Sequence, residues 1–258
     1  MGARKADGGE CMKILVLADM HVGSRYALCP NWARPNPIQR HINRKWFEMV
    51  EEVEHVDYLI LNGDLVDGTQ RTSEGAECWT TDTQEQAKAA AELIGVIDFS
   101  KALVTYGTAY HVKDNPILDA MVADKIGAKS AWEFHFKPEG CKSIFHISHA
   151  TGVSTSIWQY RTTAIAKELV AALLNESELH PYAGIIRSHA HYYVKVSFSS
   201  FGVITPCWQS RTPYMIRKGL QLIPKLGYLT LELEDNPDKE SWRCKPSTFN
   251  MPRPELTT

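Results

Sequence analysis

Short apolar segments that each end in acidic or histidine side chains constrain this chain more than any other feature. Lys13-Ile-Leu-Val-Leu-Ala18 is followed by Asp19-Met-His21, and Tyr58-Leu-Ile-Leu-Asn-Gly63 is followed by Asp64. Short apolar runs bounded by polar residues are typical of buried strands. In open α/β sheets, ligands bind beyond the carboxyl ends of the strands. Asp-x-His also recurs by chance and suits a polar loop, so the interpretation depends on the later strands.

Two later strand-like segments end in the same way. Ser143-Ile-Phe-His-Ile-Ser148 leads into His149, and Gly184-Ile-Ile-Arg-Ser188 leads into His189-Ala-His191. Together with the earlier segments they provide two carboxylates and four imidazoles, enough to hold two divalent ions if Asp64 is shared. Mixed nitrogen and oxygen ligands suit manganese, iron, zinc or nickel better than calcium. A metal pair about 3.5–4 Å apart clamps the attacking and leaving oxygens of a phosphoryl displacement.

The segments between these strands have helical spacing, which predicts an alternation of strands and helices. Apolar residues recur three and four positions apart over residues 38–54, 82–97, 115–126 and 163–174. From Tyr192 the period changes to two, as in antiparallel strands with one buried face. We expect one domain over residues 12–250, a disordered extension over residues 1–11 and a loose tail over residues 251–258.

Composition excludes several classes of protein. The 258 residues carry a net charge of −2, which gives no general field for nucleic acid, although a local basic groove is compatible with it. No apolar run approaches the roughly 20 residues that span a bilayer, and the first 11 residues lack an apolar signal core. The six cysteines are scattered, without a Cys-x-x-Cys pair. We expect a cytoplasmic protein with reduced cysteines and no membrane contact; its oligomeric state is not indicated.

The ordered motifs resemble those of the calcineurin-like metallophosphoesterase superfamily over about residues 12–212. They are Asp19-x-His21, Gly63-Asp64-x-x-Asp67, His149 at the end of a strand, and Ser188-His189-x-His191 where the family usually has Gly-His-x-His. The resemblance implies an α/β (α+β) fold: a four-layer αββα sandwich of two mixed β-sheets flanked by helices.

The same resemblance implies roles for the six ligand residues. One metal ion is held by Asp19, His21 and His191. The other is held by His149 and His189, and Asp64 bridges the two. Both ions are expected to be divalent, with manganese favoured over iron, zinc or nickel. A hydroxide between them attacks phosphorus, because coordination lowers the pKa of bound water.

The third motif departs from the family pattern of Gly-Asn-His followed by an acid. In the family the Asn is a metal ligand and the His assists the leaving group. Here the sequence is Gly107-Thr108-Ala109-Tyr110-His111. Thr108 is therefore a candidate additional ligand, whereas Ala109 has no proton chemistry. His111 either replaces the missing ligand or serves as a general acid.

Three functions are compatible with these residues. The first is a dimetal phosphoric ester hydrolase acting on phosphomonoesters or phosphodiesters. The second is a DNA or RNA nuclease of the same type, suggested by arginines and aromatic residues near the motifs but not by the net charge. The third is a weakly catalytic binding or scaffold protein, suggested by the altered third motif. Arg211 could bind a phosphate oxygen of the substrate bidentately; a solvated loop arginine is the alternative.

Overall fold

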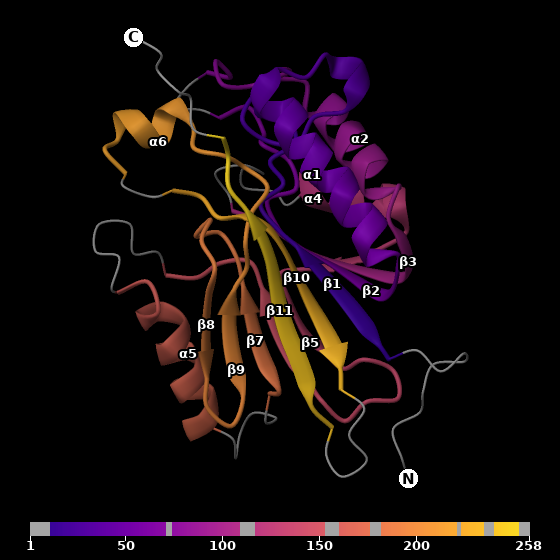
Figure 1. The fold of residues 1–258 in the computed structure, drawn as a ribbon, viewed down its shortest axis with the longest axis vertical. Coiled ribbons are helices and arrows are strands. Elements are labelled where there is room, and N and C mark those ends of the chain that lie inside the picture. Colours follow the sequence, from indigo (N-terminus) through magenta and orange to yellow (C-terminus); the bar gives the residue numbers. More distant parts are fainter. Residues whose placement is uncertain are drawn as a thin grey trace.

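Two β-sheets face each other at the centre of the computed structural model (Figure 1). The structure describes residues 11–70, 74–108, 117–152, 160–175, 182–220, 223–234 and 240–252. Almost all of the predicted extension over residues 1–11, and most of the predicted tail over residues 251–258, lie outside these ranges. The single-domain assignment stays a prediction.

Both sheets are mixed. The first has the strand order β11 (Trp242–Phe249), β10 (Leu226–Leu233), β1 (Lys13–Leu17), β2 (His55–Asn62), β3 (Asp98–Thr105) and β4 (Lys129–Ala131). The second has the order β5 (Glu133–Phe136), β6 (Phe145–Ser148), β7 (Gly184–Arg187), β9 (Phe201–Ile204) and β8 (Val194–Ser197). Strands β1 to β4 are parallel, as are β6, β7 and β9, whereas the pairings of β10, β11, β5 and β8 are antiparallel.

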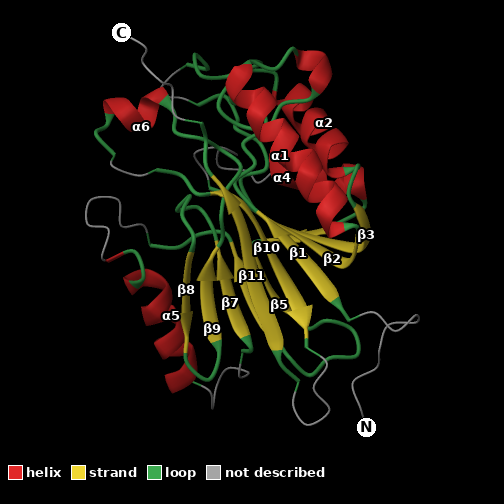
Figure 2. Cartoon of the chain, in the orientation of Figure 1, coloured by secondary structure: helices red, strands yellow, loops and turns green. Residues whose placement is uncertain are grey.

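Helices cover the outer face of each sheet (Figure 2). The helices α1 (Pro37–Val53), α2 (Thr83–Ile94) and α4 (Ile117–Ile126) pack on the first sheet, and α5 (Thr163–Leu174) packs on the second. Two short helices, η1 (Asn31–Ala33) and α6 (Pro213–Arg217), lie in loops. Helix α1 begins with a capping box between Asn36 and Gln39, and Asp82 caps α2. No helix in the described ranges has the length and apolar character needed to cross a membrane.

The alternation of side chains along β1 explains the layers. Leu15 and Leu17 point into the core beneath the helices, together with Trp46 of α1. Ile14 and Val16 point the other way, into a second core between the two sheets. A third core lies between α5 and the second sheet. The three cores separate four layers, so the predicted αββα sandwich is confirmed.

Most helices and strands lie where the sequence predicts them, but β4, β9, β11 and α6 form in segments without a predicted element, and β3 and β10 differ in detail. Strand β3 begins at Asp98, before the apolar run of residues 101–106 that predicts a strand here. The alternation in β10 predicts one exposed face, but Thr230 is buried because β10 is an inner strand between β1 and β11. The parallel arrangement brings the carboxyl ends of β1, β2, β6 and β7 together, and the motif residues follow these strands.

Candidate metal centre

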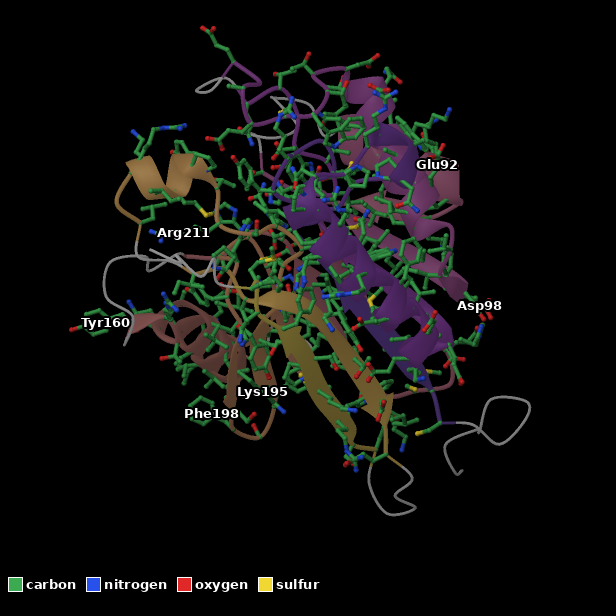
Figure 3. All side chains as sticks on the ribbon, turned by 45° about the horizontal axis from the view of Figure 1, so that its top comes forward. Glu92, Asp98, Tyr160, Lys195, Phe198 and Arg211 are labelled. Carbon is green, nitrogen blue, oxygen red and sulfur yellow. The ribbon has the colours of Figure 1, made fainter. Side chains whose placement is uncertain are left out.

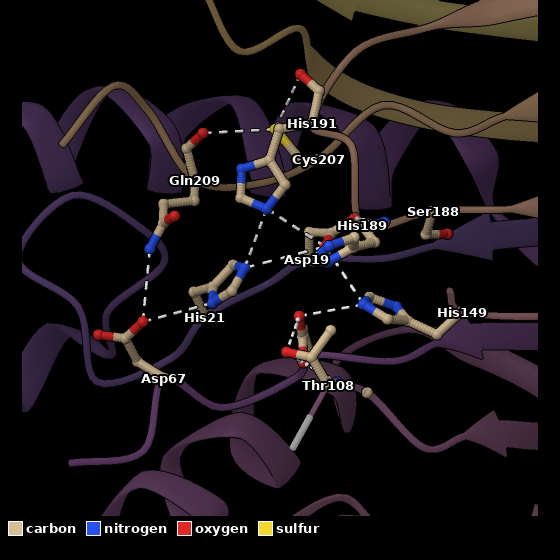
Figure 4. Close-up of polar contacts among 12 residues, drawn as sticks. Asp19, His21, Asp67, Thr108, His149, Ser188, His189, His191, Cys207 and Gln209 are labelled. Atoms are coloured by element: carbon tan, nitrogen blue, oxygen red, sulfur yellow. Dashed lines mark hydrogen bonds and ion pairs between the residues drawn. The ribbon is translucent and has the colours of Figure 1, made fainter. Parts of the chain in front are cut away.

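All six side chains predicted as ligands converge at the carboxyl ends of the strands. Figure 4 labels five of them: Asp19, His21, His149, His189 and His191. The six side chains divide into two groups, and the ligand atoms within each group lie within 4.8 Å of one another: Asp19, His21 and His191 in the first, Asp64, His149 and His189 in the second. Each group combines residues from both sheets. The two groups adjoin, because Oδ1 of Asp19 lies 3.9 Å from Nε2 of His149.

The first group surrounds one point with acceptor atoms. Nε2 of His21 lies 3.1 Å from Nε2 of His191. Oδ1 of Asp19 lies 3.3 Å from the same His191 atom and 3.9 Å from Nε2 of His21. This buried oxygen makes no hydrogen bond of ordinary geometry to any residue within the described ranges. The group fits a divalent cation, because two imidazole nitrogens and a carboxylate oxygen form a mixed nitrogen and oxygen ligand set around one point.

The second group has the same property, and here the tautomer can be assigned. The carbonyl oxygen of Asn62 carries no proton, so Nδ1 of His149 must donate in their 2.7 Å hydrogen bond. The neutral ring then presents a lone pair on Nε2, which lies 3.0 Å from Oδ2 of Asp64. Only a second proton or a cation makes this contact favourable. The hydrogen bond to Asn62 also orients the ring, as partners of metal-ligating histidines do.

A glycine makes the approach of His149 possible. Gly63 precedes Asp64 and has a φ of +77°. A Cβ atom at Gly63 would lie 2.5 Å from Nδ1 of His149. A larger residue would displace the imidazole as well as strain the turn.

Electrostatic interactions favour the charged forms of Asp19, His149 and His191, whereas burial and the charge of His149 lower the pKa of His189. Burial raises the pKa of Asp19, but the positive charges of His191 and His149 outweigh burial and hold that pKa below its usual value. Burial lowers the pKa of His149, but Asp64 and Asp19 together raise it to about 9. The pKa of His191 is raised well above the usual value because Asp19 outweighs burial. Protons on the imidazoles therefore balance the buried carboxylates, and a divalent cation would balance the same charge.

The backbone is unusual at five of the six residues. Asp19, His21, Asp64, His189 and His191 all have φ between +44° and +67°. Residues other than glycine rarely adopt this left-handed region, although Asp and His tolerate it better than most. Such strained conformations cluster at functional sites, where the surrounding structure over-determines them. Their coincidence at the strand ends marks these residues as a site.

A family comparison agrees with this geometry. The sequence profile of the calcineurin-like phosphoesterases matches residues 12–193. The chain belongs to the calcineurin-like phosphoesterase family. No protein of curated function matches the sequence.

Several solved structures resemble this calcineurin-like phosphoesterase in fold at low sequence identity. A dimetal phosphatase from Danio rerio is 10% identical with a TM-score of 0.47, over 93% of this chain and 99% of that one. The calcineurin-like phosphoesterase YfkN from Bacillus subtilis is 11% identical with a TM-score of 0.42, over 93% and 91% of the two chains. Vacuolar protein sorting 29 from Cryptosporidium parvum is 10% identical with a TM-score of 0.42, over 93% and 100%.

The altered third motif places Thr108 against Asp64. The backbone N–H of Thr108 donates to Oδ1 of Asp64 at 2.7 Å, and its hydroxyl lies 3.2 Å from Oδ2. Whether Thr108 also binds metal stays a prediction. His111 lies outside the described residues. Arg211 is exposed beside α6 (Figure 3), and its guanidinium donates to the carbonyl of Leu220 at 2.8 Å. Its proposed contact with substrate stays a prediction.

Supporting residues that the sequence does not reveal surround the predicted ligands of this phosphoesterase. The side chain of Asn62 donates to the hydroxyl of Ser188 at 2.6 Å and accepts from that of Thr105 at 2.7 Å. It also donates to the carbonyl of Ser148. Asn62 therefore joins the first sheet to the residues that precede His149 and His189. The hydroxyl of Ser188, where the family usually has Gly, completes this buried network.

A third cluster resembles a metal site in composition only. Glu133, His135 and His146 lie together on β5 and β6. Arg187 donates to Nδ1 of His146 at 2.9 Å, because a guanidinium has no acceptor. The neutral ring therefore carries its proton on Nε2, which donates to Glu133 at 3.1 Å. His146 has no lone pair left for a metal ion.

Proposed function

We propose that this protein is a dimetal phosphoric ester hydrolase acting on phosphomonoesters or phosphodiesters. The observation that carries the proposal is the pair of adjoining groups in which potential ligand atoms converge. Nε2 of His149 and Oδ2 of Asp64, 3.0 Å apart, make a favourable contact only with a proton or a cation between them, and the Nε2 atoms of His21 and His191 lie 3.1 Å apart. Membership of the phosphoesterase family supports the same chemistry.

The ligand groups suggest how the centre is assembled. Asp19, His21 and His191 would hold one divalent ion, and Asp64, His149 and His189 the other, with Asp64 shared. Nitrogen-rich, mixed ligands favour manganese, iron, zinc or nickel, of which we favour manganese. Two such ions would clamp a phosphate ester and would lower the pKa of bound water, which would supply the nucleophile.

Residues of the chain orient the ligand side chains and shield them from solvent. The N–H of Thr108 holds Oδ1 of Asp64, so that Oδ2 faces His149. The ligand side chains are almost fully buried apart from His189, which therefore lies at the open side of the centre. Ala109 has no proton to give the leaving group, and we propose that His111 supplies it. Nucleic acid is the less favoured substrate because the net charge of −2 provides no general attraction to phosphate.

Elemental analysis combined with two hydrolysis assays tests the proposal. The purified protein, loaded with manganese, is analysed for bound metal and assayed on p-nitrophenyl phosphate and bis(p-nitrophenyl) phosphate. We expect two ions per chain and turnover of at least one ester. The Asp64→Asn variant should lose metal and fall at least about 100-fold in turnover, because a ligand contributes more than the 10–100-fold typical of its supporting partners.

The matched control is Asp98→Asn, which alters an exposed aspartate at the start of β3. It should retain the metal and turnover of the wild type. A manganese-loaded wild type that hydrolyses neither ester, or an Asp64→Asn variant with wild-type turnover, would refute the hydrolase assignment and favour a binding role for the fold.

A further inference from the structure

Asp119, in the first turn of α4, is a buried acid with no role assigned above. Its side chain has no solvent exposure. Oδ1 accepts a hydrogen bond from the backbone N–H of Leu65 at 3.1 Å, and Oδ2 accepts one from the N–H of Gly107 at 2.7 Å. One carboxylate thus joins two turns that are 42 residues apart in the sequence.

Both turns carry residues of the metal centre. Leu65 follows Asp64 in the turn after β2, and Gly107 precedes Thr108 in the turn after β3. The turns touch directly, because a Cβ atom on Gly107 would lie 2.1 Å from Oδ1 of Asp64. The N–H of Thr108 then reaches the same oxygen. Asp119 stabilises this contact by accepting a hydrogen bond from each turn.

Neither an amide nor an apolar side chain would do this as well. A carboxylate accepts two hydrogen bonds at once, one on each oxygen, whereas an amide offers one acceptor oxygen and one donor group. Burial and the nearby Asp64 raise the pKa of Asp119 to about 7, and a carboxyl group here costs stability unless hydrogen bonds or positive charge compensate. An apolar side chain would be cheaper if α4 only needed to pack. The role of Asp119 is therefore to fix the geometry of the two turns.

We propose that Asp119 is a positioning residue that holds the turn of Asp64 against the turn of Thr108. It thereby sets the affinity of the second ligand group, which contains Asp64, for its metal ion. The inference rests on the proposed function for its metal ions. It assigns Asp119 no contact with metal or substrate. The residue acts through the orientation of Asp64 toward His149.

Metal binding to the Asp119→Asn variant tests the proposal. The side-chain NH₂ group introduced by this substitution would face one of the two backbone N–H groups, and two donors cannot form a hydrogen bond. One of the two turns therefore loses its hydrogen bond to residue 119. Metal-free wild type and variant are titrated with Mn²⁺ by calorimetry, and thermal unfolding of both metal-free proteins is recorded. We expect the affinity of one of the two ions to fall about 10–100-fold, the usual effect of removing a supporting partner. Turnover should be recovered at excess Mn²⁺, with little change in KM.

The control variant is Asp124→Asn, an exposed aspartate on the same helix. It should bind both ions as the wild type does. A folded Asp119→Asn protein with wild-type affinity for both ions would overturn the proposal. If Asp119→Asn does not fold, Asp119→Glu is used, which keeps the charge and shifts the carboxylate. Wild-type affinity in that variant, or failure of both variants to fold, would also overturn a positioning role.

A metal-independent readout separates this inference from the proposed function. The imidazole resonances of His149 in the metal-free protein report its contact with Asp64, and Asp119→Asn should shift them at fixed pH while Asp124→Asn should not. If the wild type binds ions but hydrolyses neither ester, the hydrolase assignment fails and the metal titration still decides on Asp119. If the wild type binds no ion, the resonances decide whether Asp119 orients Asp64.

Discussion

The Nε2 atoms of His21 and His191 lie 3.1 Å apart, although 170 residues separate them in the sequence. His21 follows β1 of the first sheet, and His191 follows β7 of the second. Their contact therefore records how the two sheets are placed against each other. Two ring nitrogens at this distance are joined either by a hydrogen bond between neutral rings or by a bound cation, so the packing of the sheets brings together two potential metal ligands.

Asp67 should matter for metal binding although it is not among the predicted ligands. Its Oδ1 lies 3.3 Å from Nδ1 of His21, and both residues are buried. A carboxylate at this position orients the imidazole and increases its basicity. We expect Asp67→Asn to weaken binding of the ion at His21 by about 10–100-fold, as measured by titration of the metal-free protein with Mn²⁺.

The control for this variant is Asp82→Asn, which leaves an amide oxygen to cap α2 and lies away from the ligand groups. Its metal affinity should equal that of the wild type. An Asp67→Asn protein that binds both ions with unchanged affinity would exclude an orienting role for this carboxylate.

Gly107→Ala should damage the metal centre far more than a comparable substitution elsewhere. The new methyl group would lie 2.1 Å from Oδ1 and 2.4 Å from the backbone nitrogen of Asp64, so the turn must move. Gly140→Ala is the control: nothing lies within 4 Å of its Cβ position, and its φ of +79° adds only backbone strain of about 1–2 kcal/mol. We expect metal content to fall in Gly107→Ala alone. Equal metal content in both variants would show that the close approach is unimportant.

The pKa of His146 predicts a specific pH dependence of folding. Burial, together with the charge of Arg187, lowers this pKa in the folded protein below its usual 6.5, despite the opposing effect of Glu133. Below about pH 6.5 the unfolded chain therefore binds a proton that the folded protein binds only at lower pH. The contribution of His146 to stability is complete above this range and is lost as the pH falls.

Urea unfolding of wild type and His146→Gln at pH 7.5 and pH 5.5 measures this effect. The variant lacks the hydrogen bonds of His146 at both pH values. It also avoids the free-energy cost of protonating a buried imidazole at pH 5.5, because glutamine does not titrate. The wild type should therefore be the more stable protein at pH 7.5, and the difference should narrow at pH 5.5. A difference that widens on acidification would show that the folded protein stabilises the protonated form of His146.

Cysteine reactivity should separate Cys11 from the other five. Cys11 is exposed, whereas the other five cysteines are buried. Burial raises the pKa of the Cys29 and Cys78 thiols to about 12, and thiolates are the reactive form. Iodoacetamide at pH 8 should add one label to the native protein and six after denaturation, as measured by intact mass. Two or more rapid labels on the native protein would contradict the burial of these residues.

Much of the fold and the ligand set could be predicted because the signals are local. An apolar run that stops at an acid or a histidine is visible within ten residues, as at Asp19 and Asp64. Asp119 has no such signal, since an acid in the first turn of a helix usually faces water and stabilises the helix N-terminus. It is buried only because α4 packs against the turns after β2 and β3. Asn62 is similar. The sequence predicts only that it ends a strand, whereas its hydrogen bonds to Ser148 and Ser188 depend on the position of the second sheet.

The sequence by itself determined the alternation of strands and helices, the chemistry of the six predicted ligands and their place at strand ends. Only the tertiary structure decided which imidazole faces which carboxylate, why Asp19, Asp64 and the histidines after β7 adopt left-handed backbone, and that Arg187 leaves His146 no lone pair for a metal. The physical reason is the separation in sequence of the residues that interact. Periodicity and strand termination follow from neighbouring residues, whereas contacts of about 3 Å between side chains of two sheets depend on how three separate hydrophobic cores pack at once.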